Sequence, residues 1–259
     1  MPRAEAERGR PAGTAADPIY GVHPVLEALR AGRRSLSRVR LRRGLRRPGL
    51  DEIRTAARSA GVPVQEVEPE ALLAAVPEGA STQGVLLDAG PLPEIQLEGL
   101  AAEPGLIVAL DGVEDPQNLG AITRVAEAAG ARGLLLTRRH APPLSPGVSR
   151  ASAGAIEWLP VARVPNLSRA LKTLKEKGFW IFGCDPEAEI TVFELEARVL
   201  GEAQVVVLGA EGRGLRPGIQ RALDHRVRIP MAGRVASLNV ATAAAVMLFE
   251  LGRRSGGRG

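Results

Sequence analysis

The sequence has little of the chemistry on which disulfide-bonded, metal-binding and membrane proteins depend. It holds one cysteine, Cys184, and three scattered histidines, His23, His140 and His225. One cysteine permits no internal disulfide, and the histidines lack the spacing of metal ligands, so we expect no metal site and interpret Cys184 as a plain buried residue. No apolar run approaches the roughly 20 residues that span a bilayer, and residues 1–17 lack the apolar core of a signal peptide. These absences predict a globular, cytoplasmic protein without a membrane partner.

Acidic residues are missing from one long basic stretch. Between Arg30 and Arg47 the chain carries nine arginines and no Asp or Glu, whereas the net charge of all 259 residues is only +5. The rest of the chain therefore has a net charge of −4, and the basicity is local. Such a cluster is typical of a surface that contacts nucleic-acid phosphates, and we take Arg40, Arg42 and Arg43 as candidate RNA-binding residues. The alternative is a solvated charged face in an arginine-rich protein.

The hydrophobic pattern divides the chain into two α/β units. We predict a disordered start at residues 1–17, a small unit of short helices and strands at 18–88, and a linker rich in proline and acid at 89–104. A larger unit follows at 105–254, and residues 255–259 form a flexible tail. In the larger unit, continuous apolar strands alternate with helices, which predicts a parallel sheet covered on both faces. The strands are expected at Leu106–Leu110, Gly133–Thr137, Phe179–Gly183 and Val205–Gly209, and the helices at Asn118–Ala129, Leu167–Lys177 and Val240–Leu251.

Three unusual loops lie where a parallel sheet places its ligands, beyond the carboxyl ends of strands. In the first, Asp111–Asn118, the residue types predict that Asn118 caps the following helix. Gln117, Gly120 and Arg124 would then share one helical face, with Gly120 clearing space beside Arg124 so that it can hold a phosphate or a hydroxyl. The alternative is that Asn118 only caps the helix.

The second and third loops narrow the ligand class. The loop Gly209–Gly214 lacks the G-x-G-x-x-G spacing of dinucleotide sites, and no lysine follows it as a phosphate-binding loop requires. Its exposed backbone and its acid, Glu211, suit a ligand with amino, hydroxyl and adenine groups. The third loop, residues 229–239, presents Ser237 and Asn239 before an apolar helix, and simple capping of that helix is the alternative for both.

Together these loops resemble the three motifs of the SPOUT class of RNA methyltransferases, in the SpoU/TrmH branch that methylates ribose 2′-hydroxyls. The similarity covers residues 19 to about 252. Within the branch, the chain is most similar to the RlmB type, which acts on a guanosine of 23S rRNA. The matching segments are Asn118–Arg124 for motif one, Leu208–Gly212 for motif two, Ile229–Met231 with Ser237–Asn239 for motif three, and also Tyr20–Val25, Gln83–Val85 and Ser152–Ala155.

The resemblance implies a fold that composition and periodicity do not show. In this class the parallel-sheet catalytic domain ties its C-terminal segment into a deep trefoil knot, and the enzymes are homodimers that pair through catalytic-domain helices; here the helix Ala241–Leu251 is the expected surface. The small unit would be a ribosomal-protein-like domain that binds RNA. The implied cofactor is S-adenosylmethionine, held in the knot largely by backbone groups. On this chain the cofactor-binding positions are Leu208, Gly209, Ile229, Met231 and Leu238.

The resemblance also assigns the catalytic residues. Arg124 would act on the ribose hydroxyl, with the remaining four residues positioning it: Asn118, Glu211, Ser237 and Asn239. The expected activity is ribose 2′-O-methylation of RNA, most specifically of a guanosine in 23S rRNA. A tRNA or another rRNA, including a resistance-type target, is the alternative substrate. A non-catalytic RNA-binding or ribosome assembly factor is the alternative of another class, which the presence of all five catalytic residues disfavours.

Overall fold

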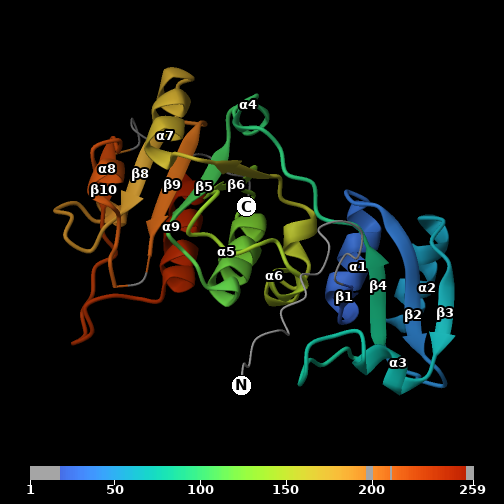
Figure 1. Ribbon diagram of the computed structural model, residues 1–259. Coiled ribbons are helices and arrows are strands. Elements are labelled where there is room, and N and C mark those ends of the chain that lie inside the picture. The colour runs from blue at the N-terminus through green and yellow to red at the C-terminus, as the bar shows by residue number, and fades with distance from the viewer. Residues whose placement is uncertain (1–17, 197–200, 211, 255–259) are drawn as a thin grey trace, which may run out of the picture.

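The computed structural model describes residues 18–196, 201–210 and 212–254, which form two α/β lobes (Figure 1). The predicted disordered start, the predicted flexible tail and the candidate Glu211 lie outside the described residues. The smaller lobe follows the sequence order β1(Ile19–Tyr20), α1(Val22–Ala31), β2(Leu36–Arg42), α2(Leu50–Ser59), β3(Val64–Val67), α3(Pro69–Leu73) and β4(Val85–Ala89).

The small lobe is built on a four-stranded mixed sheet in the order β1-β4-β2-β3, in which only β2 and β3 run parallel. Strand β2 shows why the basic segment folds this way. Val39 and Leu41 are fully buried under α1 and α2, while the alternating Arg38, Arg40 and Arg42 point to the other face of the sheet. This period-two pattern is the strand geometry that the sequence predicts for the segment.

The larger lobe contains the predicted parallel sheet. Its order is β10-β8-β9-β5-β6-β7, and every pair of neighbours runs parallel. The elements are β5(Leu106–Asp111), α5(Pro116–Ala128), β6(Gly133–Thr137), α6(Pro146–Ala151), η1(Ala155–Glu157), β7(Val161–Val164), α7(Leu167–Glu176), β8(Trp180–Cys184), η2(Val192–Glu194), β9(Gln204–Gly209), α8(Pro217–Gln220), β10(His225–Val227) and α9(Val240–Arg254).

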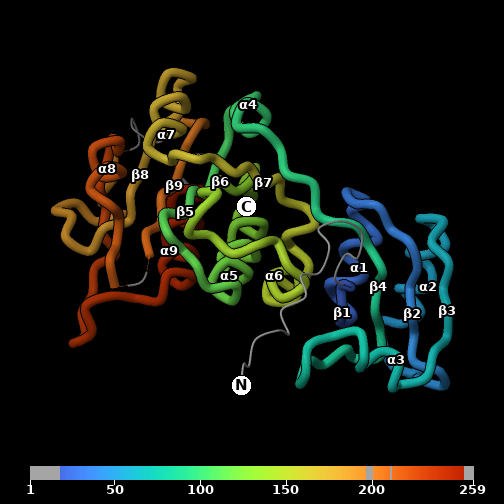
Figure 2. The backbone as a smooth tube through the Cα atoms, in the orientation of Figure 1, coloured from blue at the N-terminus to red at the C-terminus, as the bar shows by residue number. Residues whose placement is uncertain are grey.

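Two apolar layers cover the two faces of this sheet. Alternate residues of β5 point into opposite layers. Val108 and Leu110 pack with α5, α6 and α9, while Ile107 and Ala109 pack with α7 and α8. Burial on both faces explains why the central strands are continuous apolar runs. Figure 2 shows the chain leaving β10, running along the carboxyl edge of the sheet and turning back into α9, which packs against α5.

The segment predicted as a linker, residues 89–104, connects the two sheets and has structure of its own. It contains the short helix α4(Leu97–Leu100), and Leu92 and Leu100 are buried in the two cores of the larger lobe. The backbone N–H of Ile95 donates to the carbonyl oxygen of Val161 at 2.8 Å. Most of this connection is therefore packed as part of the larger lobe.

Candidate active site

The helix that follows β5 is capped by an aspartate and not by the asparagine that the sequence predicts. The Asp115 carboxylate accepts hydrogen bonds from the backbone N–H groups of Gln117 at 3.0 Å and Asn118 at 3.4 Å, and α5 begins at Pro116. A carboxylate here also suits the positive end of the helix dipole. The expectation that Asn118 is the cap is wrong, because Asp115 already satisfies the free N–H groups of the first turn.

The Asn118 side chain instead joins the first loop to the third. Its Oδ1 accepts a hydrogen bond from Nδ2 of Asn239 at 2.9 Å. The Oδ1 of Asn239 accepts from the backbone N–H groups of Ala241 at 2.9 Å and Thr242 at 3.4 Å, so Asn239 also caps α9. The capping alternative is thus correct for Asn239. The same amide nevertheless ties together two loops that lie 121 residues apart in the chain.

A cavity of about 480 Å³ lies beyond the carboxyl ends of β8 and β9. This volume is within the range of about 300–1,000 Å³ that small-molecule sites occupy. The structure brings all five predicted cofactor residues to its wall, together with Ser237 and Asn239; these five are Leu208, Gly209, Ile229, Met231 and Leu238. The wall combines apolar side chains with the exposed backbone of three glycines in loop 209–214, a surface suited to a flat ring and its polar edges.

The loop after β8 adds cavity residues that the sequence analysis does not single out. Cys184, Pro186 and Glu187 line the same cavity, and Cys184 ends β8. Because β8 is one of the predicted parallel strands, the rule that ligands lie at carboxyl ends points to this loop as well. Burial, followed by the charge of Asp185, raises the pKa of Cys184 to about 11, so its sulfur is a neutral thiol at pH 7.

The glycine loop after β9 folds closely back on itself. The backbone N–H of Gly214 donates to the carbonyl oxygen of Ala210 at 2.9 Å, and Gly212 and Gly214 have φ of 77° and 63°. A Cβ on Gly209 would lie 2.3 Å from the carbonyl carbon of Gly214. Gly209 is therefore required first by the fold of the loop, and its exposed backbone faces the cavity as a result.

An ion pair fixes the end of this loop to the neighbouring strand. The fully buried carboxylate of Asp111, at the end of β5, accepts hydrogen bonds from the backbone N–H of Arg216 at 3.0 Å and from its Nε at 2.7 Å. A buried carboxylate needs such partners because desolvation of an unpaired charge is costly. The pair holds the glycine loop in register with β5, so it shapes the cavity without lining it.

Arg124 is exposed on α5, two turns after Asn118, and is not part of the cavity wall. Within the described part of the chain it forms no hydrogen bond or ion pair, so its guanidinium is free to meet a substrate. The sequence predicts that Gly120 clears space beside Arg124, and this prediction is wrong. A Cβ on Gly120 would lie 2.3 Å from Cβ of Ala151, so this buried glycine lets α5 and α6 pack closely.

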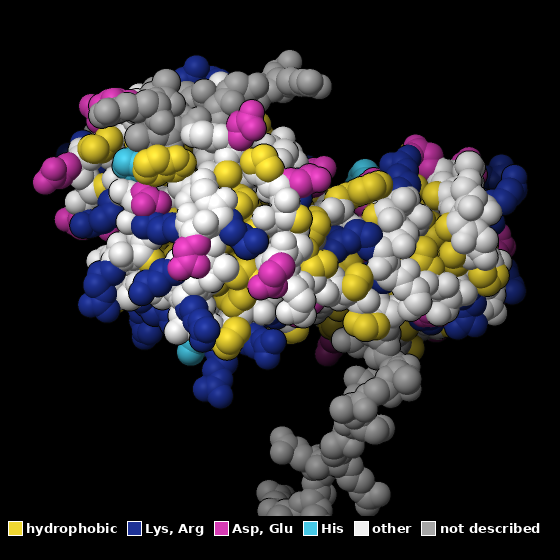
Figure 3. Space-filling view, turned by 90° about the horizontal axis from the view of Figure 1, so that it is seen from above, with side chains coloured by type: hydrophobic (Ala, Val, Ile, Leu, Met, Phe, Trp, Pro, Cys, Tyr) yellow, Lys and Arg dark blue, Asp and Glu magenta, His cyan; other side chains and the backbone are white. Residues whose placement is uncertain are grey.

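Several arginines of the basic segment are already paired with carboxylates, which its sequence alone does not show. Arg40 pairs with Asp88 and Arg43 pairs with Glu68 at 2.6 Å, whereas Arg42 has no such partner among the described residues. The acids come from other strands and loops, which the segment's own sequence does not reveal. In the view of Figure 3, Lys and Arg side chains lie on both lobes and gather along one margin of the larger lobe. Basic surface is thus shared by both lobes.

Neither a metal nor a membrane feature is found in the part of the chain that the structure describes. No group of three or more His, Cys, Asp or Glu side chains there could hold a metal ion. No described helix is both long and apolar enough to cross a membrane.

Comparison with known families identifies both lobes. Residues 105–249 match the model of the SpoU rRNA methylase family, and residues 18–94 match a model described as RNA 2′-O ribose methyltransferase substrate binding. The chain belongs to the SpoU rRNA methylase family. It is an RNA 2′-O-ribose methyltransferase that uses S-adenosylmethionine. Its catalytic domain is preceded by the substrate-binding domain of such enzymes.

Individual relatives extend this assignment over most of the chain. The 23S rRNA (guanosine-2′-O-)-methyltransferase RlmB of Pseudomonas putida is 38% identical over 91% of this chain and 96% of its own length. An uncharacterized tRNA/rRNA methyltransferase of Synechocystis is 39% identical over 93% of this chain, which spans 64% of that relative. The SpoU methyltransferase AviRb of Streptomyces viridochromogenes, solved with AdoMet, is 26% identical with a TM-score of 0.75, over 92% of this chain and 89% of its own.

Proposed function

We propose that this enzyme methylates the ribose 2′-hydroxyl of a guanosine in 23S rRNA. One observation carries the site assignment: the second and third motif loops line one cavity, and a hydrogen bond between Asn118 and Asn239 joins the first loop to the third. The substrate assignment is supported by similarity to RlmB enzymes along nearly their whole length. The described residues fit the cofactor, because an apolar slot edged by backbone groups matches an adenosine and a methionine chain.

In this proposal the loops divide the work. The backbone around Leu208 and Met231 binds the cofactor, which supplies a methyl group on a positively charged sulfur. Ser237 and Asn239, at the same wall, hold the ribose side of the substrate so that its hydroxyl faces the cavity. Glu211, outside the described residues, is proposed as a further positioning group.

Arg124 is proposed to hold the target nucleotide from outside the cavity wall. An arginine is effectively always protonated in proteins, so it is a poor proton acceptor. Its planar set of donors is well suited to bind a phosphate and to stabilise charge that develops on the ribose oxygen. We therefore propose orientation and charge stabilisation as the role of Arg124.

We further propose a deep trefoil knot at the C-terminal segment and a homodimer that pairs through α9. The return of the chain from the carboxyl edge into α9, beside α5, supports the knot. Phe249, on the outer side of α9, is 53% exposed. An exposed large apolar side chain at this position supports contact with a second copy of the chain. Because the substrate is proposed to be rRNA, we place the enzyme in the cytoplasm.

The decisive experiment maps 2′-O-methyl groups in rRNA and tRNA from cells with the gene, without it, and without it but expressing Arg124→Ala. We expect one guanosine of 23S rRNA to lose its methyl group in the deletion strain and to stay unmethylated with the variant. Loss at a tRNA position, or at another rRNA nucleotide, would replace the proposed substrate. No change at any RNA position would favour a binding or assembly factor.

A further inference from the structure

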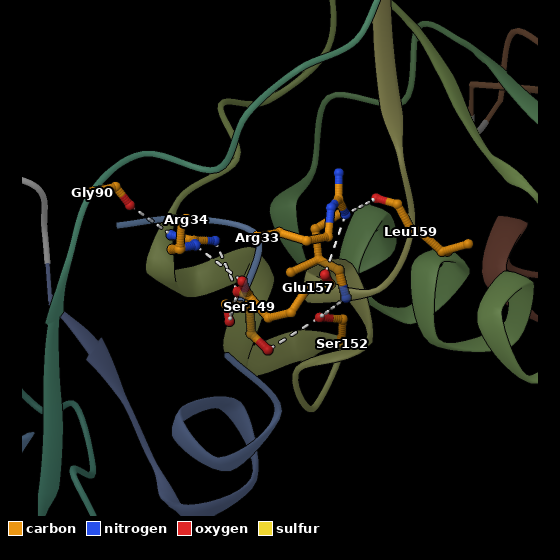
Figure 4. Close-up of polar contacts among 8 residues, drawn as sticks. Arg33, Arg34, Gly90, Ser149, Ser152, Glu157 and Leu159 are labelled. Atoms are coloured by element: carbon orange, nitrogen blue, oxygen red, sulfur yellow. Dashed lines mark hydrogen bonds and ion pairs between the residues drawn. The ribbon is translucent and has the colours of Figure 1, made fainter. Parts of the chain in front are cut away.

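Two arginines of the basic segment are turned away from solvent and toward the catalytic lobe. The side chains of Arg34 and Glu157 are only 7% and 1% exposed. Their contact is bidentate: Nε of Arg34 lies 2.9 Å from Oε2 of Glu157, and Nη2 lies 2.8 Å from Oε1 (Figure 4). The pair joins the turn before β2 in the small lobe to the 3₁₀ helix η1 in the large lobe.

The remaining polar atoms around this pair are also satisfied. Ser149 donates its hydroxyl to Oε1 of Glu157 at 3.1 Å, and Nη1 of Arg34 donates to the carbonyl oxygen of Gly90 at 3.2 Å. Beside them, Nη1 of Arg33 donates to the carbonyl oxygen of Leu159 at 2.7 Å. Burial raises the pKa of Glu157, and the charge of Arg34 counteracts that effect. The carboxylate therefore depends on the small lobe for its charge partner.

Further contacts flank the pair and limit rotation of one lobe on the other. Nε1 of Trp158 donates to Oε2 of Glu27 at 2.8 Å. Arg150 donates to the carbonyl oxygen of Ser81 at 2.8 Å, and its guanidinium lies 5.6 Å from the ring centre of Tyr20. Contacts at several separated points define an orientation, whereas a single contact would act as a pivot.

The orientation that results has a consequence for the substrate. In Figure 1 the turn after β2 and the carboxyl ends of β8 and β9 lie on the same, lower side of the molecule. Arg42 ends β2 and Arg46 lies in that turn; both are exposed and have no ion-pair partner among the described residues. One continuous RNA could therefore contact the turn and reach the cavity from the same side.

We propose that Arg34 and Glu157 are positioning residues that lock the substrate-binding lobe at one distance and angle from the active site, so that the lock selects which nucleotide of the bound RNA reaches the cavity. The inference rests on the proposed function, because it assumes an RNA long enough to touch both lobes. Neither residue touches the reacting atoms. Their effect is transmitted through the orientation of the small lobe.

The lock affects one kinetic step in particular. If the small lobe is loosened, its own RNA contacts are intact and capture of the RNA is unchanged. The bound RNA then moves with a loosely tethered lobe. The effective concentration of the target ribose at the cavity is lower, and its hydroxyl is less well aligned with the cofactor. The expected signature is a loss of kcat at saturating RNA with little change in KM, and methylation of additional nucleotides near the target.

The test compares Arg34→Ala, Glu157→Gln and the double variant with the wild type, using the full-length chain and the rRNA fragment that contains its mapped target. Arg58→Ala is the matched control, because Arg58 is an exposed arginine of the same lobe and lies away from the junction. We expect kcat to fall roughly tenfold or more in both single variants. The double variant should be no worse than the single ones, because both changes remove the same contact.

Two further measurements keep the outcomes distinct. Cofactor affinity by calorimetry should equal that of the wild type, which shows that the catalytic lobe is folded, and small-angle scattering should show a looser pair of lobes. Glu157→Gln keeps the shape of the side chain and serves as the test should Arg34→Ala fail to fold. Wild-type kcat and target choice in loosened variants would overturn the lock, as would a raised KM with unchanged kcat, since Arg34 would then bind RNA itself. A wild type without activity on 23S rRNA would instead refute the proposed function.

Discussion

At the scale of single residues, Asn239 performs two hydrogen-bonding tasks with one side chain. Its carbonyl oxygen caps α9, and its NH₂ group donates to Asn118. An amide carries its acceptor and its donor on separate atoms, so one side chain can make both contacts. Residue identity at position 239 is therefore set by the meeting of two loops as well as by the helix start.

This dual role gives a prediction that separates stability from catalysis. Asn239→Asp should keep the cap, because a carboxylate is a good N-cap, but it cannot donate to Oδ1 of Asn118. We expect a free energy of unfolding, measured by thermal denaturation, within about 0.5 kcal/mol of the wild-type value. We also expect a large loss of methyl transfer. Asn239→Ala should lose both, with about 1 kcal/mol of stability. Equal activity in wild type and Asn239→Asp would contradict the coupling.

Arg124 yields a second prediction from its exposure. Because it is exposed and forms no hydrogen bond or ion pair with other described residues, Arg124→Ala should change the free energy of unfolding by less than about 0.5 kcal/mol. Removing a charge-stabilising group should nevertheless lower kcat by roughly 100-fold or more. Arg124→Lys should be similarly impaired, because a compact ammonium does not reproduce the planar donor fork. Glu127→Ala, exposed on the same helix, is the control.

Cys184 is a built-in reporter of the cavity, because it is the chain's single cysteine. With a pKa of about 11, very little thiolate is present at neutral pH, so labelling by iodoacetamide should be slow at pH 7.5 and accelerate steadily toward pH 11. Saturating S-adenosylmethionine should protect the thiol. Mass spectrometry of the intact protein measures both effects. Labelling at the rate of a free cysteine would contradict the raised pKa, and labelling without protection would place the cofactor elsewhere.

At the scale of elements, apolar periodicity predicts the central strands and long helices of the larger lobe. The predicted Gly133–Thr137 agrees fully with β6, and α7 begins at the predicted Leu167. Strands β7 and β10, which are four and three residues long, are not predicted from the sequence. Strands this short carry too few alternations to be recognised, and their pairing with β6 and β8 defines them instead.

The loops show a similar division between what sequence can and cannot give. The carboxyl-end rule correctly brings loops 209–214 and 229–239 to one cavity, whereas the first loop does not line it and is joined to the third by Asn118. It does not show that Asp115 takes the capping role from Asn118, or that Gly209 packs on Gly214. These details depend on distances between backbone atoms, which residue types and spacings alone do not specify.

The glycine loop gives an element-scale prediction. Gly209→Ala would place Cβ 2.3 Å from the carbonyl carbon of Gly214, which is backbone and cannot move aside cheaply. We expect a lower Tm and at least about tenfold weaker S-adenosylmethionine binding, or about 1.4 kcal/mol, by calorimetry. Gly218→Ala is the control, because a Cβ there meets nothing within 4 Å and alanine favours the short helix α8. Identical behaviour of the two variants would show that the loop adapts.

At the scale of the whole molecule, the basic segment has a different meaning from the one that its composition suggests. A segment that holds nine arginines and no acid, between Arg30 and Arg47, predicts a uniform phosphate-binding patch. The fold sorts these arginines by partner: Arg33 and Arg34 hold the lobes together, Arg40 and Arg43 pair with acids of the small lobe, and Arg42 and Arg46 stay without ion-pair partners. Sequence shows the charges, but only the fold shows which of them are already neutralised.

This sorting predicts unequal effects on RNA binding. Each phosphate contact steepens the dependence of log K on log salt by about 0.7–0.9. Arg42→Gln with Arg46→Gln should therefore weaken rRNA binding and reduce the slope by up to about 1.8, twice that per-contact value. Arg40→Gln with Arg43→Gln removes the same formal charge but leaves Asp88 and Glu68 unpaired or with fewer partners.

The paired arginines contribute less to binding than the unpaired ones, because a neighbouring carboxylate competes with the phosphate for each guanidinium. The Arg40 and Arg43 variant should thus show a smaller change in salt slope, measured by filter binding of the target rRNA fragment at several salt concentrations. Cofactor affinity should be equal in both double variants, because the cavity lies in the other lobe. If Arg40 and Arg43 prove the stronger pair, RNA must displace Asp88 and Glu68 on binding, and the substrate surface would then form only in the complex.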